Sequence, residues 1–357
     1  MQPEVLFNFI CWLPLIQFSW LLIGYYRPIS LNSAKYGAGS ITVVIPYRNE
    51  EKNLPKLIKN LNGLKLAADD RIFLVDDGSK DSGIPNDINL RKEISILPLQ
   101  DHAAGSKKLA LSHAIRSTST DWILTTDADC EFGPDWVEAM RNHLNKDIHM
   151  LIGPVLTTYV SGFVELFQPY ESICLWSVTK ASSGWNIPVL CSGANLLFRR
   201  STWIELDGYK SHEHISSGDD VLLMNDISKR WKKGVQTISD PRCLVVTTGF
   251  NSWKLVLNQR KRWISKTNHL TGFNKKLLVI GLIFWLCLPV FAFFYDFRWP
   301  GILLVGETIF IWSVLQGFSR PFNAIHWLFF RLLYPFFLVV LLFYNPRKLL
   351  WKGRVVQ

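Results

Sequence analysis

Asp127 and Asp129 stand two residues apart at the end of an apolar run, in the stretch DWILTTDAD that covers residues 121–129. Two carboxylates at this spacing can together hold a hard divalent cation, which neutralises a diphosphate that departs as a leaving group. A single DxD sequence is equally compatible with a solvated turn. The pair therefore predicts a metal and diphosphate site only if other motifs point to the same chemistry.

A second acidic pair, Asp76 and Asp77, is followed by Gly78 and Ser79 after another apolar run. Carboxylates in this place can accept hydrogen bonds from a nucleotide base or ribose, and glycine lets a ligand approach the backbone closely. The alternative is an ordinary turn built on aspartate and glycine. On the first interpretation this pair would bind a nucleotide.

The third acidic pair, Asp219 and Asp220, precedes the helical run VLLMNDISK. A carboxylate in a partly desolvated cleft can act as general base for a sugar hydroxyl, and an adjacent acid can raise its pKa. The alternative is structural, because aspartate is a good N-cap residue and Asp219 could begin the helix in this way. The two roles are compatible.

The sequence QRKRW at residues 259–263 lies just before a long apolar region. Helical spacing would place Gln259, Arg262 and Trp263 on one face, which would offer an amide, a cation for phosphate and an aromatic platform for a sugar ring. The alternative is a basic belt beside a membrane with an interfacial tryptophan. Alone, the motif does not decide between them.

The elements that must position these residues alternate between strands and helices. Apolar runs at 41–46, 72–77 and 121–129 end in polar residues, as buried parallel strands do. Apolar residues recur at helical spacing within residues 50–64. The pattern predicts an α/β fold with a ligand crevice along the edge of the sheet where the strands end.

The composition points to a globular protein with parts embedded in a membrane. Of the 357 residues, 48% are hydrophobic and 19% are charged, which excludes a disordered chain. The net charge of +10 favours anionic partners. We expect no nucleic-acid partner, because the basic residues are not interleaved with aromatic ones as on a single-strand platform. The six scattered cysteines predict a reducing compartment.

Long apolar stretches at both ends predict an integral membrane protein. We expect an uncleaved N-terminal transmembrane anchor in residues 1–30, a central domain over 40–274, about three C-terminal transmembrane or membrane-embedded helices over 275–345, and a basic tail over 346–357. The apolar segments themselves are Val5–Tyr26, Leu277–Tyr295, Pro300–Leu315 and Trp327–Tyr344.

Basic residues next to the apolar segments place the central domain in the cytosol by the positive-inside rule. The C-terminal tail is basic too, so one C-terminal segment could be re-entrant or interfacial rather than crossing. Glu307 and Arg331 lie within apolar segments, where ionisable groups are costly. They could form an ion pair with each other or line a path for the acceptor.

The motifs occur in the order seen in membrane-bound family 2 glycosyltransferases, and the chain resembles that family over roughly residues 41–270. It is similar to the branch that contains cellulose, chitin and hyaluronan synthases and ceramide glucosyltransferase, which share the pattern D, DxD, D, QxxRW. The segments that carry the resemblance are IPYRNEE (45–51), VDDGSKD (75–81), SKKLAL (106–111), TTDADC (125–130), CSGANLLFRR (191–200), SGDDVLL (217–223) and QRKRW (259–263).

This resemblance implies an A-type glycosyltransferase (GT-A) fold, flanked by transmembrane helices. It also implies a nucleotide-diphosphate sugar as donor, with a UDP-sugar favoured, Mg²⁺ or Mn²⁺ as cofactor, and inversion of the anomeric centre. The positions that match the family's donor site are Pro46, Arg48, Glu50, Asp76, Asp77, Lys107, Asp127, Ala128 and Asp129. Of these, Asp127 and Asp129 match the metal ligands. Ser106, before Lys107, stands where the family usually has glycine.

For the acceptor side, the resemblance places Gly193, Ala194 and Asn195 in the loop beside the acceptor. It makes Asp220 the general base, with Asp219 beside it. Gln259, Arg262 and Trp263 match the motif that holds the diphosphate and the acceptor end.

We therefore expect a membrane glycosyltransferase (EC 2.4) that acts on a lipid or lipid-linked acceptor, in the plasma (inner) membrane if the source is bacterial. The few C-terminal segments favour a single transfer over a processive polysaccharide synthase. A third possibility, from another class, is an inactive nucleotide-sugar-binding membrane protein, against which the intact set of acids argues. Residues 163–185 predict a helix, either in the core or on the membrane surface. His212 and His214 are expected in a loop near the acceptor rather than at a metal.

Overall fold

The computed structural model describes residues 3–28, 39–85, 88–99, 107–159, 162–212, 218–265, 298–344, 350–351 and 354–355. The chain divides into two compact units. We call the first the sheet unit, formed by Ile29–Thr158, Leu190–Thr248 and Lys348–Gln357. We call the second the helical unit, formed by Met1–Pro28, Tyr159–Val189 and Gly249–Arg347.

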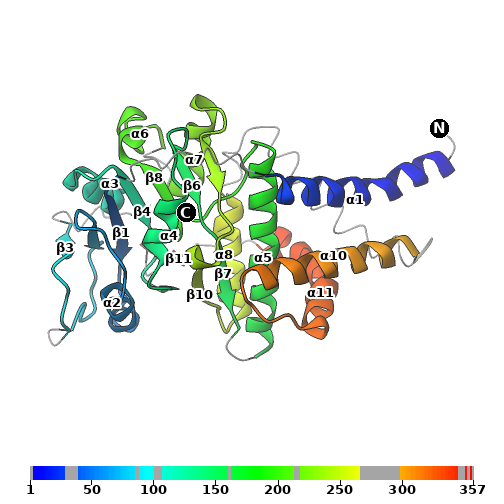
Figure 1. Ribbon diagram of the computed structural model, residues 1–357. Coiled ribbons are helices and arrows are strands. Elements are labelled where there is room, and N and C mark those ends of the chain that lie inside the picture. The colour runs from blue at the N-terminus through cyan, green and yellow to red at the C-terminus, as the bar shows by residue number, and fades with distance from the viewer. Residues whose placement is uncertain are drawn as a thin grey trace. The chain divides into compact units, whose positions relative to one another are not determined.

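The sheet unit is built on a seven-stranded sheet in the order β3-β2-β1-β4-β8-β6-β9 (Figure 1). Its strands are β1 (Ile41–Tyr47), β2 (Arg71–Asp76), β3 (Ile94–Pro98), β4 (Trp122–Thr125), β6 (Met150–Ile152), β8 (Leu196–Arg199) and β9 (Val235–Thr237). The first four run parallel, whereas β8 is antiparallel to both β4 and β6. The three predicted strands are confirmed as β1, β2 and β4.

The strand order reverses at β1, which has β2 on one side and β4 on the other. In open α/β sheets, ligands bind in the crevice outside the carboxyl ends of the strands at such a switch point. The predicted crevice therefore has a defined place, beyond Tyr47, Asp76 and Thr125, where β1, β2 and β4 end.

Helices and a smaller sheet complete the sheet unit. The helices are α2 (Leu54–Asn62), α3 (Lys107–Ser117), α4 (Trp136–Asn142), α6 (Arg200–Glu205) and α7 (Asp219–Arg230), and the three-stranded sheet has the order β5-β10-β7, from β5 (Cys130–Phe132), β10 (Val245–Thr248) and β7 (Val155–Thr158). Two short strands, β11 (Leu350–Trp351) and β12 (Arg354–Val355), pair with each other. The apolar positions of α2 that predicted a helix are all buried, because they pack on the same core as the strands.

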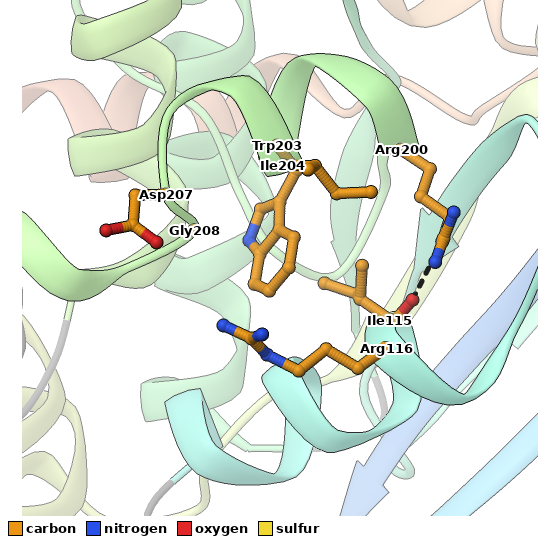
Figure 2. Close-up of a pocket in the computed structure, with 7 residues that line it drawn as sticks. All are labelled: Ile115, Arg116, Arg200, Trp203, Ile204, Asp207 and Gly208. Atoms are coloured by element: carbon orange, nitrogen blue, oxygen red, sulfur yellow. Dashed lines mark hydrogen bonds between the residues drawn. The ribbon is translucent and has the colours of Figure 1, made fainter.

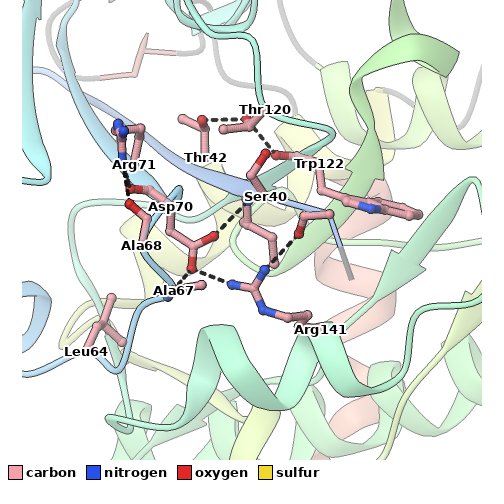
Figure 3. Close-up of polar contacts among 12 residues, drawn as sticks. Ser40, Thr42, Leu64, Ala67, Ala68, Asp70, Arg71, Thr120, Trp122 and Arg141 are labelled. Atoms are coloured by element: carbon pink, nitrogen blue, oxygen red, sulfur yellow. Dashed lines mark hydrogen bonds and ion pairs between the residues drawn. The ribbon is translucent and has the colours of Figure 1, made fainter. Parts of the chain in front are cut away.

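Asp70 holds together the end of the sheet opposite the crevice (Figure 3). Its fully buried carboxylate accepts the N–H groups of Ile41 (2.9 Å) and Ala67 (2.7 Å) and pairs with the guanidinium of Arg141. Arg141 also donates to the carbonyl of Gly39 at 2.8 Å. One acid thus fixes the start of β1, the loop before β2 and helix α4.

The helical unit contains α1 (Pro3–Tyr26), α5 (Phe163–Gly184), α8 (Trp253–Ser265), α10 (Arg298–Gly317) and α11 (Ala324–Phe343). Helix α1 packs closely on α5, because a Cβ added at Gly184 would lie only 2.0 Å from the carbonyl oxygen of Gly24. The indole of Trp185 donates to the carbonyl of Trp20 at 2.9 Å. Helix α5 confirms the predicted helix at 163–185, and its residues Phe167 and Ile173 are fully buried, as in a core helix.

The predicted membrane segments meet different outcomes. Among the described residues, α11 is long and apolar enough to cross a membrane, and Leu15–Tyr26 and Gly301–Gly317 form shorter apolar helices. The predicted segment Leu277–Tyr295 lies outside the described residues. In the described part of the C-terminal region, one helix is a candidate span by length and composition, where about three were expected over 275–345.

Glu307 and Arg331 confirm the predicted pairing inside the apolar segments. Arg331 Nε donates to Glu307 Oε2 at 2.8 Å, and both side chains are at least 90% buried. Pairing offsets the cost of placing two charges among apolar side chains. The pair joins α10 to α11.

Candidate active site

The loops that follow β1 and β2 are joined by hydrogen bonds. Asn49 N–H donates to Ser79 Oγ at 3.1 Å, and Lys80 N–H donates to Asn49 Oδ1 at 2.8 Å. Further along, Glu51 N–H donates to Asp81 Oδ2 at 2.9 Å. The carboxyl ends of these two strands therefore form one continuous rim of the crevice.

Arg48 and Asp77 lie buried within this rim. Arg48 donates from its guanidinium to the carbonyl of Asp77, whose side chain is also buried. The neighbouring Asp76 accepts the N–H of Ser79 at 2.8 Å through Oδ1. The turn that we considered as the alternative for this motif is therefore present, and Asp76 closes it, while Asp77 sits at the strand end where the resemblance places a nucleotide contact.

Pro46 and Glu50 flank the same strand end. Pro46 pairs with Val75 in the β1–β2 ladder and is the partly exposed residue of an otherwise buried strand. Glu50 is buried, and its carbonyl accepts the N–H groups of Asn53 and Leu54, so it begins the turn into α2. Its carboxylate accepts the side-chain amide of Asn53 at 2.6 Å.

Asp127 and Asp129 occupy the turn between β4 and β5. The chain leaves the sheet after Thr126, whose N–H donates to the carbonyl of Val44 at 3.3 Å. The turn closes where Cys130 N–H donates to the carbonyl of Asp127 at 3.2 Å. Ala128, between the two acids, is buried in this turn, whereas Asp127 is partly exposed and Asp129 is exposed.

Lys107, the first residue of α3, pairs with the DxD turn. Its Nζ lies 2.6 Å from Asp127 Oδ1. Burial alone would lower the pKa of Lys107, but Asp127, Asp219 and then Asp220 outweigh it and raise the pKa, so the ammonium stays charged. Loss of hydration first and the charge of Asp127 second raise the pKa of Asp129. Because part of the Asp129 residue is exposed, solvent limits how far the pKa rises.

Gly193 brings the third acidic pair to the same place. Its N–H donates to Asp220 Oδ2 at 3.1 Å, and its carbonyl accepts the hydroxyl of Thr125, the last residue of β4, at 2.7 Å. A Cβ added at Gly193 would lie 3.5 Å from Lys107 Nζ and 3.7 Å from Asp219 Oδ2. Glycine therefore leaves room among the lysine and both acids.

Helix α7 begins at Asp219, and its N-cap is Gly218, with a left-handed φ of 89°. The alternative in which Asp219 caps the helix is therefore wrong, because Asp219 already lies in the first turn. The acids still gain from this position, since the exposed N–H groups of a helix start favour negative charge. Asp220 Oδ1 accepts the N–H of Val221 at 2.8 Å, which fixes the carboxylate.

Ala194 and Asn195 are buried behind Gly193. The Asn195 amide donates to the carbonyls of Pro154 (2.9 Å) and Cys243 (2.8 Å), and its oxygen accepts the indole N–H of Trp136 at 3.1 Å. The Asn195 side chain therefore ties the start of β8 to the smaller sheet. Of the three residues predicted on the acceptor side, Gly193 is the one that borders the charged cluster.

Sequence reasoning missed two residues at this site. The phenol of Tyr209 is buried, and burial first and the charges of Asp219 and Asp220 second raise its pKa. The buried Cys130 follows the DxD turn, and burial and then Asp129 and Asp127 raise the pKa of its thiol, so it stays protonated and is a poor nucleophile. Cys130 ends the TTDADC segment but was given no role there, and Tyr209 lies outside every motif, so the fold was needed to place both beside the acids.

The motif QRKRW lies on α8 in the helical unit. Trp263 is 37% exposed, whereas Arg260, which the sequence analysis did not single out, is 5% exposed. Gln259 and Arg262 are partly buried. The motif forms a helix, as its spacing predicted, but its buried charged side chain is that of Arg260.

One cavity of about 340 Å³ lies apart from these residues (Figure 2). Its lining residues are Ile115, Arg116, Arg200, Trp203, Ile204, Asp207 and Gly208. Arg200 N–H donates to the carbonyl of Asp121, just before β4, so the cavity lies at the opposite end of that strand from Asp127. It is not part of the candidate site.

The donor set at the DxD turn suits a metal ion that is shared with a ligand. Among the described residues, no group of three or more histidine, cysteine, aspartate or glutamate side chains is placed to hold a metal ion. Asp127 and Asp129 supply hard carboxylate oxygens, as Mg²⁺ and Mn²⁺ prefer. Because Mg²⁺ is usually bound by one or two carboxylates plus substrate phosphates, the pair fits a metal held jointly with a diphosphate.

Residues 42–203, from β1 into α6, match the family described as Glycosyl transferase family 2. This part of the chain is similar to glycosyl transferase family 2. The matched segment contains the rim, the DxD turn, Lys107 and Gly193, whereas α7 and α8 follow it. The match supports the expected family over these residues, and the membrane-bound branch within it stays a prediction.

Two curated relatives are glycosyltransferases. The chain is 28% identical over 123 residues to a pre-mycofactocin glycosyltransferase of Mycobacterium tuberculosis, which covers 34% of this chain and 24% of the relative. It is 23% identical over 273 residues to an N-acetylglucosaminyltransferase of Sinorhizobium fredii, which covers 68% of this chain and 60% of the relative. The chain thus spans less than two thirds of the length of either protein.

A solved structure shares the fold across almost the whole chain. It is the mannosyltransferase PcManGT of Pyrobaculum calidifontis in complex with GDP-Man and Mn²⁺, with a TM-score of 0.56 and 15% identity over 94% of this chain and 98% of that one. With the family match, this likeness confirms the predicted α/β GT-A fold.

Proposed function

We propose that the protein is a glycosyltransferase that transfers a sugar from a nucleotide-diphosphate donor, with inversion, to a hydroxyl of a lipid or lipid-linked acceptor. One observation carries the proposal. Lys107, Asp127, Asp219, Asp220 and Gly193 converge at the carboxyl ends of the central strands. These residues come from four separate stretches of sequence, so their convergence is not a local turn.

The donor would lie along the rim. Asp77 and Arg48 suit the nucleotide, with Pro46 and Glu50 shaping the strand end and Asp76 holding the turn. A Mg²⁺ or Mn²⁺ ion on Asp127 and Asp129 would neutralise charge on the departing diphosphate. Lys107 adds a fixed positive charge on the same side, where preorganised charge is worth most.

Asp220 would take the proton from the acceptor hydroxyl as its oxygen attacks the anomeric carbon. Gly193 N–H and Val221 N–H each hold one of its carboxylate oxygens. A carboxylate has about four lone-pair sites, so a proton can still be accepted at either oxygen. Asp219 keeps its proposed place beside the base. Gln259, Arg262 and Trp263 keep the proposed role of holding the diphosphate and the acceptor end.

The distribution of charge in the helical unit supports a membrane setting. On α10, the exposed positions include Ile302, Val305, Ile309 and Trp312, spaced three or four residues apart, whereas Glu307 is buried. A helix in water has the reverse pattern, with charge outside and apolar residues inside. An apolar outer face with an ionised group inside is what lipid exposure requires.

Helix α11 repeats this arrangement. Its exposed large apolar residues are Ile325, Leu328, Leu332, Phe336, Val339, Val340, Leu342 and Phe343. Arg331 is buried and paired with Glu307. We propose that both helices face lipid, with the sheet unit in the cytosol, as the basic residues beside the apolar segments predict.

A membrane setting favours an acceptor that resides in the membrane, because the enzyme and a lipid-linked hydroxyl then meet in two dimensions. A single transfer remains favoured over a processive polysaccharide synthase. An inactive nucleotide-sugar-binding protein would need the rim but no general base. This chain has a candidate base, Asp220, whose carboxylate is held in a fixed orientation.

The test is a donor screen on the full chain in lipid nanodiscs with Mg²⁺ or Mn²⁺. Release of nucleotide diphosphate is followed with and without a membrane-lipid extract, and product length is read by mass spectrometry. Release that needs lipid and yields a single-sugar product supports the proposal. Long polymers would favour the synthase, and donor binding without release from any donor would favour the inactive binder.

A further inference from the structure

Arg260 is a buried charge inside the motif QRKRW. It lies on α8 between Gln259 and Lys261, and its side chain is 6% exposed. A buried guanidinium is costly unless it is paired and hydrogen-bonded. The contacts of the Arg260 side chain therefore indicate its role.

Glu171 of α5 is its ionic partner, with a side chain that is 4% exposed. Arg260 Nε donates to Glu171 Oε2 at 3.0 Å, and a second nitrogen of the guanidinium contacts the same oxygen. The guanidinium is planar, so two contacts to one carboxylate fix its orientation as well as its position. Helix α5 thereby sets where the charged end of Arg260 lies.

The same guanidinium contacts two other residues of the motif. Its carbon lies 4.5 Å from the centroid of the Trp263 ring, within the range of a cation–π interaction. Another of its nitrogens donates to Gln259 Oε1. Residues 260 and 263 are three apart on a helix, so they are neighbours on its surface.

We infer that Arg260, held by Glu171, is the positioning residue for Gln259 and Trp263. This inference rests on the proposed function, in which those two side chains hold the diphosphate and the acceptor end. Arg260 itself is buried and acts through them. Without it, the Trp263 ring would lose its cationic neighbour and the Gln259 amide would lose its fixed donor.

The chain offers a matched control for a purely structural role. Glu307 and Arg331 form a second buried glutamate–arginine pair in the same unit, on α10 and α11. Replacing a buried ion pair by apolar residues of similar volume is often neutral or stabilising, whereas removing one partner leaves an uncompensated charge. The variants are therefore the double substitution Glu171→Leu with Arg260→Met and the control Glu307→Leu with Arg331→Met.

Both double variants should melt within a few degrees of the wild type in nanodiscs. The Glu171/Arg260 variant should lose about 10²-fold in kcat/KM for the acceptor, the scale of a misplaced binding group. The control should keep its kcat/KM. If the Glu171/Arg260 variant kept both the melting temperature and the kcat/KM of the wild type, the inference would be wrong.

A second readout does not depend on turnover. In protein labelled with 5-fluorotryptophan, the fluorine resonance of Trp263 is assigned by its loss in Trp263→Phe. It should shift or broaden in the Glu171/Arg260 variant and stay in place in the control. An unmoved Trp263 resonance would refute the positioning role even if the wild type showed no transfer, whereas absence of transfer with a moved resonance would count against the proposed function alone.

Discussion

Substitution of Gly193 by alanine should separate catalysis from stability. The added Cβ would meet Lys107 Nζ at 3.5 Å, Asp220 Cβ at 3.6 Å and Asp219 Oδ2 at 3.7 Å, all ordinary van der Waals distances. The φ of Gly193 also lies outside the left-handed region that alanine avoids. The folded state should therefore accept the methyl group without strain.

The expected change in stability is small and favourable. Replacing glycine by alanine in a compatible conformation stabilises a protein by about 0.4–1 kcal/mol, because the unfolded chain loses freedom. At about 2–4 °C per kcal/mol for a domain of this size, the melting temperature should rise by about 1–4 °C. Transfer should nevertheless fall about tenfold or more, because the methyl occupies the space where the acceptor hydroxyl must reach Asp220.

Gly63 provides the matched control. It ends α2 with a φ of −84°, and a Cβ there would approach the carbonyl of Asn60 to 3.5 Å, so alanine fits equally well, and neither Asp219 nor Asp220 is among the atoms it would meet. Both variants are compared by thermal melting and by initial rates of diphosphate release. If Gly193→Ala kept the activity of Gly63→Ala, the space beside Asp220 would not be the acceptor site.

Three further predictions concern other parts of the sheet unit. Asp70→Ala should lower the free energy of unfolding by about 3–5 kcal/mol in urea denaturation, because it leaves the partly buried Arg141 without its ionic partner and two backbone N–H groups without their acceptor; a loss below 1 kcal/mol would contradict this account of Asp70. Mn²⁺, followed by electron paramagnetic resonance, should bind far more tightly with a nucleotide diphosphate present than without, since Asp127 and Asp129 supply only part of its ligands; equal affinity in both cases would show a site made by protein alone. Burial first and Arg199 second lower the pKa of His149 from its usual 6.5, so the folded protein binds fewer protons than the unfolded chain below about that pH. Stability should then fall from pH 7 to pH 5, and His149→Gln should flatten that fall; an unchanged slope would assign it to other groups.

The sequence was a good guide where long apolar runs form the elements. The runs at 41–46, 72–77 and 121–129 gave β1, β2 and β4, although β4 ends at Thr125 because the DxD turn leaves the sheet there. Strands β6, β8 and β9 have only three or four residues. They are stabilised by neighbours distant in sequence, so the local sequence has no hydrophobic periodicity that would predict them.

The candidate site shows the same division. The acids were recognisable because their types and order are unusual, and the fold brings the DxD turn and Asp219–Asp220 to one lysine. The roles of Asn195 and Arg260 were not recognisable, because each depends on partners far away in the chain, such as Pro154 for Asn195 and Glu171 for Arg260. The spacing of residues along the sequence does not show that a polar side chain is buried against a distant partner.

The most direct test of the proposed mechanism is Asp220→Asn on the full chain in lipid, with Asp226→Asn, on the same helix α7, as the matched control. Donor affinity is measured by calorimetry and transfer by diphosphate release. The account predicts that Asp220→Asn binds the donor as the wild type does and loses about 10²–10⁴-fold in turnover, the range expected for a general base, while Asp226→Asn keeps both. Turnover retained by Asp220→Asn would contradict the assignment of Asp220 as the base.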